Sequence, residues 1–536
     1  MATAIKLDPS HCDANYYYGL KKMEDGETSL AISFMEAALA IEPSRIDILF
    51  NVANSCLALY DNKMALDYFN RCLDVDPSFY GALINKVEAL RRLGRYQLAH
   101  QALDEINIVD DNNIEVAALR GFLHASQGNY QMSVALYKEV LAQEPENTTV
   151  LLNLGNTYLE TGNINDAIMC IDKVLSRTPE DKTALNNMGS AYYCCGQLGT
   201  AKSYIRRALD LDPDYHLAEL NLGYCLLSEG SYQDGLRFYE HRFSRQNIPP
   251  PYVHPILPRL DIDSLTSCSS LLVVAEQGLG DTIQFARYCK VLVERDISFS
   301  FCAPEKLHGL IKESGLHPCP IGYTEANQIK DGSWLPLLSL PLYLGVDYGK
   351  PLVNQPYLST TAILKEKWRR IFEGERKRPI IGLHWQGNKQ TERRNLAGRS
   401  FPLEAFNTAL KGKDIDLVSL QKGYGSEQLA HCSFSSQFLG CQSTVDSTLD
   451  FLECAAILTC CDLIVTSDSC LAHLSAGLGM PTWLLLNHIP DWRWGMQGED
   501  TFWYPTMRIF RQNDKGDWNT LMEDVSNALY EYFSSP

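Results

Sequence analysis

Apolar and polar positions follow two different patterns in the two halves of the chain. Up to about residue 243, apolar residues recur with the period of about 3.6 that is typical of amphipathic helices. Beyond about residue 263, short apolar runs alternate with amphipathic segments, as in strands that alternate with helices. The chain is therefore expected to join an all-helical region to an α/β region with parallel strands.

A 34-residue period organises the helical half. Glycine and proline each recur with this period, except that Tyr60 occupies one glycine position and Asp111 occupies one proline position. The recurring residues are Gly26, Gly94, Gly128, Gly162, Gly196 and Gly230, and Pro9, Pro43, Pro77, Pro145, Pro179 and Pro213. The glycine is expected to end the first helix of each unit in a left-handed conformation, and proline to end the second. A third row, led by Gly19, requires a small residue where two helices cross closely.

This period resembles the tetratricopeptide repeat, with about six full units over residues 12–215 and a seventh over residues 216–243. The resemblance predicts an α-solenoid over residues 1–243, whose concave groove binds a protein or peptide. Asparagines on the first helix of each unit are the candidate acceptor groove, because an amide side chain can hold an extended backbone. They are Asn51, Asn54, Asn153, Asn156, Asn187 and Asn221. The alternative is that they are surface amides or hydrogen-bond partners between helices.

A proline-rich connector is expected at residues 244–263, and the first strand follows at 271–276. The strand runs into a turn with Gly278 and Gly280 and then a helix, which is the plan of a phosphate-binding βα unit. A dinucleotide site is not favoured, because Ile283 occupies the place of the third glycine. Asp281 lies at the carboxyl end of the strand, where ligands bind in open α/β sheets, although it could also serve only as a helix cap.

A second set of strands is predicted at residues 379–385, 415–420 and 462–466. The last of these ends in Ser467, Asp468 and Ser469 and enters a helix that carries His473, and a further strand is expected after that helix at residues 482–486. Serine hydroxyls and the free amides of a helix start together form an anion cradle. Residues 365–399 hold 11 Lys/Arg against 4 Glu, a local charge of +7, and within them Lys389 and Arg399 are the candidate phosphate ligands.

Composition excludes several classes of protein. The 536 residues include 47 Lys/Arg and 65 Asp/Glu, and this net charge of −18 argues against a general nucleic-acid binder. No secretory signal and no membrane span are apparent, so a cytoplasmic location is expected. The 17 cysteines are then expected to be reduced thiols, and because no C-x-x-C spacing occurs, no metal site is predicted.

Two segments, Glu276–Arg287 and Ser467–Leu474, resemble the signature segments of heptosyltransferase-like glycosyltransferases. Residues 490–512 resemble the tail of a bacterial subgroup that joins tetratricopeptide repeats to such a domain, although Trp492 and Trp494 could equally be core residues. The resemblance implies a GT-B fold of two Rossmann-like domains, with residues 264–360 on the acceptor side and 361–536 on the nucleotide-sugar side.

The family further implies a role for each matching residue. Asp281 would be the general base, and Ser467, Asp468, Ser469 and His473 would line the donor phosphate site. No cofactor or metal ion is expected, and the reaction would invert the anomeric centre. The favoured function is transfer of a sugar from a nucleotide-sugar to a hydroxyl of a protein acceptor, with flagellin as one possibility. Two alternatives are a glycan or lipid-linked saccharide acceptor, and a repeat scaffold with an inactive transferase domain.

Overall fold

The computed structural model describes residues 8–109, 114–244, 257–387, 392 and 398–534. The chain divides into two compact units, Met1–Ala184 and Leu185–Pro536. The division falls inside helix α12 (Lys182–Cys194), and therefore within the helical repeats rather than at residue 243, where the sequence pattern changes.

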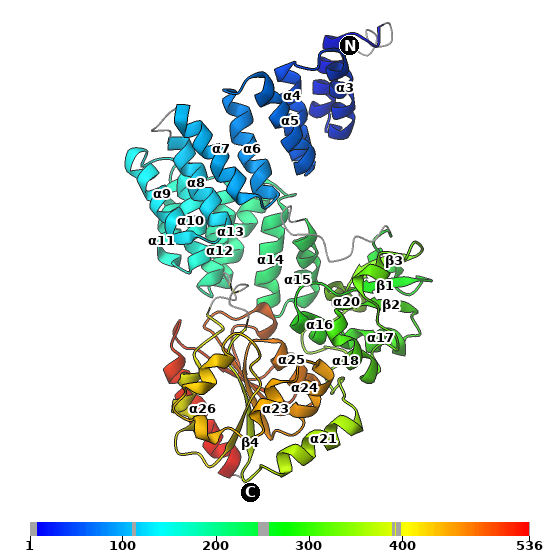
Figure 1. Cartoon of the computed structure of the whole chain (residues 1–536), viewed down its shortest axis with the longest axis vertical. Helices are drawn as coiled ribbons and strands as arrows, with labels where there is room; N and C mark the ends of the chain where they lie inside the picture. Colours follow the sequence, from blue (N-terminus) through cyan, green and yellow to red (C-terminus); the bar gives the residue numbers. More distant parts are fainter. Residues whose placement is uncertain (1–7, 110–113, 245–256, 388–391, 393–397, 535–536) are drawn as a thin grey trace. The chain divides into compact units, whose positions relative to one another are not determined.

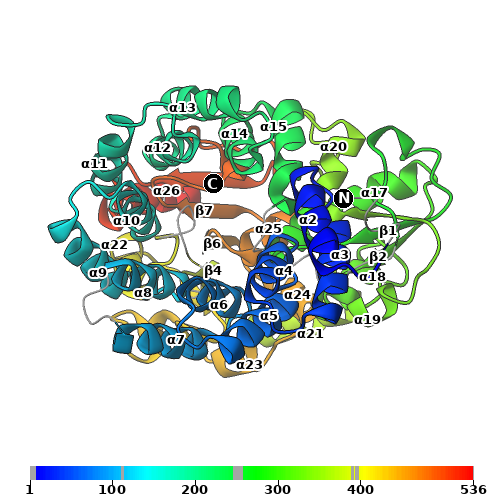
Figure 2. The same cartoon turned by 90° about the horizontal axis from the view of Figure 1, so that it is seen from above.

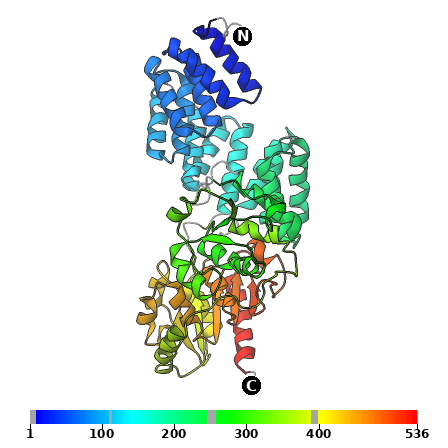
Figure 3. The same cartoon turned by 90° about the vertical axis from the view of Figure 1, so that its right-hand side faces the viewer.

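Helix pairs make up the described part of the first unit, and successive pairs pack against each other in chain order (Figure 1 and Figure 3). The pairs are α2 (Cys12–Glu24) with α3 (Thr28–Ile41), α4 (Ile46–Ala58) with α5 (Asn62–Val75), α6 (Tyr80–Arg92) with α7 (Tyr96–Val109), α8 (Ile114–Ser126) with α9 (Tyr130–Gln143), and α10 (Thr148–Thr161) with α11 (Ile164–Leu175). The buried apolar faces of α2 to α8 form one core that continues from one pair to the next.

The glycine that recurs in each repeat ends the first helix in a left-handed conformation, as predicted. Gly162 is the C-cap of α10 with φ of 75°, and the other glycines of this row also have positive φ. Tyr60 occupies the same place after α4 with φ of 62°, a conformation that is unfavourable for a residue with a side chain. The backbone turn is thus imposed by the packing of the helix pair even where glycine is absent.

The row led by Gly19 allows close helix crossing, also as predicted. A Cβ atom on Gly121 would lie 2.7 Å from the ring of Tyr137, and one on Gly189 would lie 2.5 Å from Ile205 Cγ1. Both distances are far below van der Waals contact, so only glycine fits where the two helices of these pairs cross.

The second unit begins with two more helix pairs, which are followed by two parallel sheets. The remaining helices of the repeats are α12, α13 (Leu198–Leu211), α14 (His216–Ser228) and α15 (Tyr232–Tyr239), and the 3₁₀ turn η1 (Glu240–Phe243) follows them. The first sheet contains β1 (Leu271–Val274), β2 (Phe299–Cys302) and β3 (Ser333–Pro336), in the order β2-β1-β3. The second contains β4 (Ile380–His384), β5 (Asp416–Ser419), β6 (Leu463–Ser467), β7 (Thr482–Leu486) and β8 (Met507–Arg511), in the order β5-β4-β6-β7-β8.

All named strand pairs are parallel, and β4, β6 and β7 lie side by side in that order (Figure 2). In register, Leu271 of β1 is opposite Phe299 and Ser333, and Ile381 of β4 is opposite Leu463 of β6. The strands expected near residues 271, 380, 416, 463 and 482 are confirmed, whereas β2, β3 and β8 were not foreseen.

Helices lie between the strands of both sheets, and one more helix follows the last strand. They are α16 (Leu279–Phe285), α17 (Arg287–Glu294), α18 (His308–Glu313), α19 (Tyr323–Ala326), α20 (Leu340–Leu344), α21 (Ala362–Glu373), α22 (Phe406–Leu410), α23 (Gln442–Asp446), α24 (Phe451–Leu458), α25 (Cys470–Gly477) and α26 (Trp518–Ser534). The helix expected after the first strand is therefore divided in two at Ala286. Within the described residues, no helix has the length and hydrophobicity to cross a bilayer.

The last helix pair shares its hydrophobic core with the α/β region. Tyr232 of α15 packs edge-on against Trp503 and Trp492, with ring centroids 5.6 and 6.0 Å apart. Trp492 and Trp494 are 2% and 3% exposed, so they are core residues rather than an open stacking surface. Since these aromatic contacts join residues more than 200 positions apart in the chain, periodicity alone does not reveal them.

Candidate functional site

A pocket of about 1330 Å³ opens where the loops after the strands of both sheets meet. The first sheet contributes residues 277–281, which follow β1, and the second contributes residues that follow β4, β5 and β6. Of the predicted site residues, Gly278, Gly280, Asp281, Arg399, Asp468, Ser469 and His473 all line it. The expectation that ligand-binding residues follow the carboxyl ends of parallel strands, here called the strand-end rule, therefore selected residues that meet in one pocket although their segments are nearly 200 positions apart.

Asp281 lies in the first turn of α16 and has two partners. Its Oδ2 accepts a hydrogen bond from the Gly278 backbone N–H at 2.9 Å, and its Oδ1 is ion-paired with Arg493. The capping role that was the alternative for this residue is therefore present. A carboxylate offers about four lone-pair positions, so these two partners leave acceptor capacity for a substrate hydroxyl, and the side chain remains 21% exposed.

Arg493 is the buried cation of the site. It pairs with Asp281 and also with Asp491 Oδ1 at 2.7 Å, and its guanidinium lies 4.8 Å from the ring centre of Trp492. Burial alone would lower the pKa of Arg493, but Asp491 and Asp281 raise it above its ordinary value. The side chain is therefore a fixed positive charge beside Asp281.

Serine and histidine side chains meet where the strand order of the second sheet reverses, between β4 and β6. Ser469 Oγ lies 3.2 Å from His384 Nδ1, and Ser467 Oγ lies 3.5 Å from the same nitrogen. Ser469 also caps α25, because its Oγ accepts from the Leu471 N–H at 3.3 Å. Ser467 is fully buried and does not line the pocket, so it supports His384 rather than facing a ligand.

Asp468 is a buried carboxyl group in the wall of the pocket. Burial and the neighbouring Asp491 raise the pKa of Asp468 to about 6, although Arg399 and Arg493 act in the opposite direction. The carboxyl group of Asp468 therefore gains or loses its proton at a pH not far below neutral. The nearby imidazole of His384 behaves differently, since burial, with a smaller effect of Arg399, lowers the pKa of that ring to about 3. His384 is thus neutral at pH 7.

His473 lies one turn inside α25 and is held on two sides. Its Nδ1 is 2.9 Å from the Tyr504 hydroxyl, and its ring stacks on Trp494 with centroids 5.3 Å apart. Burial, followed by the charges of Arg493 and Arg287, lowers the pKa of His473 well below its ordinary value, so the imidazole is neutral. When Tyr504 donates to Nδ1, the ring proton is on Nε2, where it can be donated to a ligand.

Gly280 sets the distance between α16 and α25. A Cβ atom there would lie 3.2 Å from His473 Cδ2 and 3.3 Å from Cys470 Cα, which is closer than side chains normally approach. The absence of a side chain at this position allows Asp281 and His473, on two different helices, to line one pocket.

Two further cations line the pocket on the side of the second sheet. Arg399 pairs with Glu392 at 3.3 Å, and Lys422 Nζ donates to the Val445 carbonyl. Burial lowers the pKa of Lys422 below its ordinary value. Lys389, the other predicted phosphate ligand, lies outside the described residues.

The candidate groove asparagines are half-buried on the first helices of their repeats. In the first unit, Asn51 Nδ2 donates to the Tyr16 hydroxyl at 2.8 Å, and Asn54 Oδ1 accepts from Asn85 at 2.7 Å. Such contacts between neighbouring first helices match the alternative interpretation, in which these amides join helices. Asn153 and Asn156 lie on α10 of the same unit.

The two predicted groove asparagines of the second unit lie on α12 and α14. Asn221 Nδ2 donates to Asn186 Oδ1 at 2.8 Å and to Ser190 Oγ at 3.1 Å, while Asn187 Oδ1 lies 3.5 Å from Asn186 Nδ2. Asn221 thus also joins two helices, whereas the contact between Asn187 and Asn186 is long.

Among the pocket residues that the sequence did not single out are His384, Lys422 and Arg493. His384 and Lys422 each follow or end a predicted strand, so the strand-end rule could have identified them. Arg493 lies in the segment 490–512, which was noted for its resemblance to a family tail and for its tryptophans, without a role for the arginine. No local signal pairs Arg493 with Asp281, because the two lie 212 positions apart.

The last repeat also reaches the edge of the pocket. Gln277 Nε2 donates to the Tyr239 hydroxyl at 2.9 Å, and Gln277 itself has a positive φ of 62°. The preceding residue, Glu276, forms a buried ion pair with Arg242 of η1 at 2.8 Å. Helix α15 and η1 therefore hold the loop that carries Gly278 and Asp281.

Comparison with known proteins supports the assignment of the repeats. Tetratricopeptide repeat models match residues 124–188 and 183–215. The N-terminal region therefore contains tetratricopeptide repeats, a class of structure that suggests a protein partner. A tetratricopeptide repeat protein from Parabacteroides merdae is 19% identical, with a TM-score of 0.40 over 42% of this chain and 89% of that one. The type IV pilus biogenesis factor PilW is 20% identical, with a TM-score of 0.33 over 39% and 96%.

One similar protein extends beyond the matched repeats. Protein FlbA from Caulobacter vibrioides is 25% identical over 337 residues, which are 58% of this chain and 54% of that protein. The chain thus spans about half the length of this relative.

Proposed function

We propose that the protein is a glycosyltransferase that moves a sugar from a nucleotide-sugar donor to a hydroxyl of a protein acceptor. The observation that carries this proposal is a single pocket in which a carboxylate, Asp281, and a helix start with neutral histidine, His473, face the same space from two parallel sheets. Such a pocket can hold two substrates, one near each sheet, so that they react across it.

In the proposed reaction, the acceptor oxygen attacks the anomeric carbon of the donor sugar. The new carbon–oxygen bond forms as the bond to the nucleotide diphosphate breaks, and the acceptor proton passes to Asp281. Asp281 retains acceptor capacity besides Gly278 and Arg493, as this step requires. Arg493 keeps the carboxylate in place and adds positive charge to the pocket.

The departing diphosphate is assigned to the start of α25. There the free backbone amides, the Ser469 hydroxyl and the Nε2–H of His473 can donate hydrogen bonds to phosphate oxygens. Arg399 and Lys422 supply positive charge on the same side of the pocket. These groups stabilise the leaving group without assistance from a resident metal ion.

A protein acceptor is favoured because the chain joins this pocket to tetratricopeptide repeats. Repeats of this class bind peptides and proteins, and the similarity to FlbA extends over more of the chain than the matched repeats do. Asn153 and Asn156 of α10 are the proposed acceptor contacts, because stacked repeats place equivalent residues of their first helices on one face.

The proposal is tested first by donor binding. Calorimetry with UDP-, GDP-, ADP- and CMP-sugars should find one nucleotide class that binds, and Ser469→Ala combined with His473→Ala should weaken its binding at least tenfold. Unchanged affinity in this variant would place the donor elsewhere.

Catalysis is tested with a matched pair of variants. Asp281→Asn can still accept the Gly278 hydrogen bond, but it can no longer take a proton, so sugar transfer should fall by a factor of about 10²–10⁴. Asp491→Asn removes the other carboxylate that pairs with Arg493, and it should lower the rate of sugar transfer much less than Asp281→Asn does. Equal losses in the two variants would mean that Asp281 serves only to position Arg493.

Recruitment is tested separately. Replacing Asn153 and Asn156 by alanine should raise KM for the protein acceptor and leave slow donor hydrolysis unchanged. If KM for the acceptor does not change, these asparagines do not bind it.

A further inference from the structure

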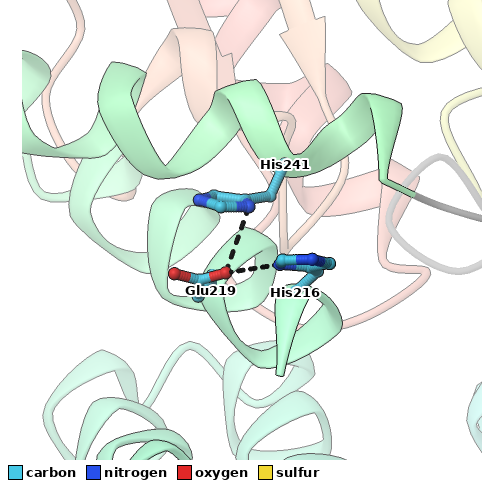
Figure 4. Close-up of side chains that lie close together, drawn as sticks. All are labelled: His216, Glu219 and His241. Carbon is cyan, nitrogen blue, oxygen red and sulfur yellow. Dashed lines mark hydrogen bonds and ion pairs between the residues drawn. The ribbon is translucent and has the colours of Figure 1, made fainter. Parts of the chain in front are cut away.

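Two histidines and a glutamate converge outside the pocket, at the end of the repeats (Figure 4). His216 and Glu219 lie in the first turn of α14, and His241 lies in η1. The Nδ1 atoms of both histidines are 3.0 Å from the same glutamate oxygen, Oε2, and the three atoms lie within 4.8 Å of one another. None of the three residues lines the pocket.

We propose that His216, Glu219 and His241 form a binding site for a divalent transition metal of the zinc class, which clamps η1 onto the start of α14. In this site both Nδ1 atoms and one oxygen of Glu219 coordinate the ion. The Nδ1 proton that His216 now donates to Glu219 is either released or moved to Nε2.

The donor set determines which metals fit. Two imidazoles and one carboxylate suit zinc, cobalt and nickel, whereas magnesium and calcium prefer oxygen ligands only. Donor atoms around a tetrahedral zinc lie about 3.3 Å apart when the bonds are about 2.0–2.1 Å. The two nitrogen–oxygen distances of 3.0 Å are already close to this value.

The side chains have room to rearrange around an ion. The two imidazole rings stack with centroids 5.1 Å apart and an angle of 21° between their planes, so one ring has to turn about its side-chain torsions before both in-plane lone pairs point at one ion. His216 is 51% exposed and His241 is 29% exposed, so both rings can close on an ion from solvent. Glu219 is only 16% exposed and supplies a negative charge at the centre of the group. Three protein ligands leave at least one position for water.

Such an ion would fix a segment that contacts the α/β region. On either side of His241, Glu240 accepts a hydrogen bond from Ser339 at 2.8 Å and Arg242 pairs with Glu276. Because Glu276 precedes the pocket loop, a clamped η1 would hold that loop more firmly. The metal is therefore assigned a structural role between the repeats and the α/β region.

The experiment titrates Zn²⁺ and Co²⁺ into the full-length protein by calorimetry after treatment with a chelator. Cys319 is exposed, so all proteins carry Cys319→Ser to remove a competing thiol. The parent protein should bind one ion, and Glu219→Gln and His241→Asn should each weaken binding by more than about 100-fold, since loss even of a second-shell partner costs 10–100-fold. X-ray absorption of the Zn²⁺ complex should show nitrogen and oxygen ligands without sulfur.

His100→Asn is the matched control. His100 also packs against a second histidine, His124, at 4.8 Å, but its hydrogen-bond partner is the amide of Gln127 rather than a carboxylate. This variant should bind the ion as the parent does. Thermal unfolding without metal should be the same for Glu219→Gln and the parent, and Zn²⁺ should raise the midpoint of the parent only. Equal affinity in all variants, or sulfur among the ligands, would overturn the proposal.

Discussion

The raised pKa of Asp468 has a measurable effect on stability. An ordinary aspartate has a pKa of 3.8, and that of Asp468 in the folded protein is about 6. Between these two values the folded state binds the proton more tightly than the unfolded state does. The free energy of unfolding therefore falls as pH rises through this window, and it stays at the lower level above about pH 6.

The size of the effect follows from the two pKa values. A difference of about two units corresponds to about 3 kcal/mol at 1.36 kcal/mol per unit, and Asp468 is only 9% exposed, so solvent screening is small. About 1 kcal/mol of this cost is already present at about pH 4.5, because the unfolded chain is then largely ionised. From about pH 4.5 to about pH 7.5, the wild type should thus lose about 2 kcal/mol that Asp468→Asn does not lose.

Urea unfolding followed by tryptophan fluorescence measures this loss. All 8 tryptophans lie between residues 334 and 518, so their emission reports the second unit. Asp468→Asn should be stabilised relative to the wild type by about 2 kcal/mol more at the higher pH, and the constant cost of burying an amide cancels in this comparison. The exposed Asp331→Asn should show no such change. A difference that is independent of pH, or one that grows toward low pH, would refute the reasoning.

Three further predictions test the packing. Glu276→Gln removes one of the two carboxylates that pair with the buried guanidinium of Arg242, and Glu240 remains as the other. The second unit should therefore lose about 1–3 kcal/mol in urea unfolding; a loss below about 0.5 kcal/mol would mean that Glu240 alone compensates the charge. Tyr60→Gly removes the strain of a residue with a side chain in the left-handed conformation, so the first unit should become about 1 kcal/mol more stable. Unfolding followed by circular dichroism measures this change, and a lower stability of the variant would mean that the strain is not significant. Gly280→Ala should lower the free energy of unfolding by about 1–3 kcal/mol, because its Cβ would lie 3.2 Å from an imidazole carbon of His473. Gly199→Ala is the control and should not lower it, because no atom lies within 4 Å of the added Cβ. Equal effects of the two substitutions would mean that α16 and α25 can separate freely.

The helical half could be predicted well from the sequence because its determinants are local. A left-handed residue at the end of each first helix and a small residue at each helix crossing depend on neighbours within one repeat. Gly162 and Gly189 show the two requirements directly. The five strands that the sequence indicated are likewise apolar runs of ordinary length, whereas β2, for instance, includes two half-exposed positions and lacks a clear pattern.

The candidate site could be predicted only in part. The strand-end rule placed Asp281 and His473 in one pocket because topology alone brings the carboxyl ends of parallel strands together. The state of each group depends on partners that the rule does not supply. Arg493 pairs with Asp281 and Tyr504 orients His473, and both partners come from the loops before β8, far along the chain. Burial also raises the pKa of Asp468 above that of an ordinary aspartate, and the sequence motif does not show which of its residues are buried.

The position of the domain boundary has a consequence for the proposed function. A division at residue 243 would leave Glu276 and Gln277 without Arg242 and Tyr239, and a buried carboxylate without its cation is strongly destabilising. The last helix pair is therefore part of the unit that contains the pocket, although its sequence is that of a repeat. A partner that shifts α15 or η1 would move the loop that carries Asp281. Recognition by the repeats and chemistry in the pocket can thus be coupled through these two contacts without any change in the strands.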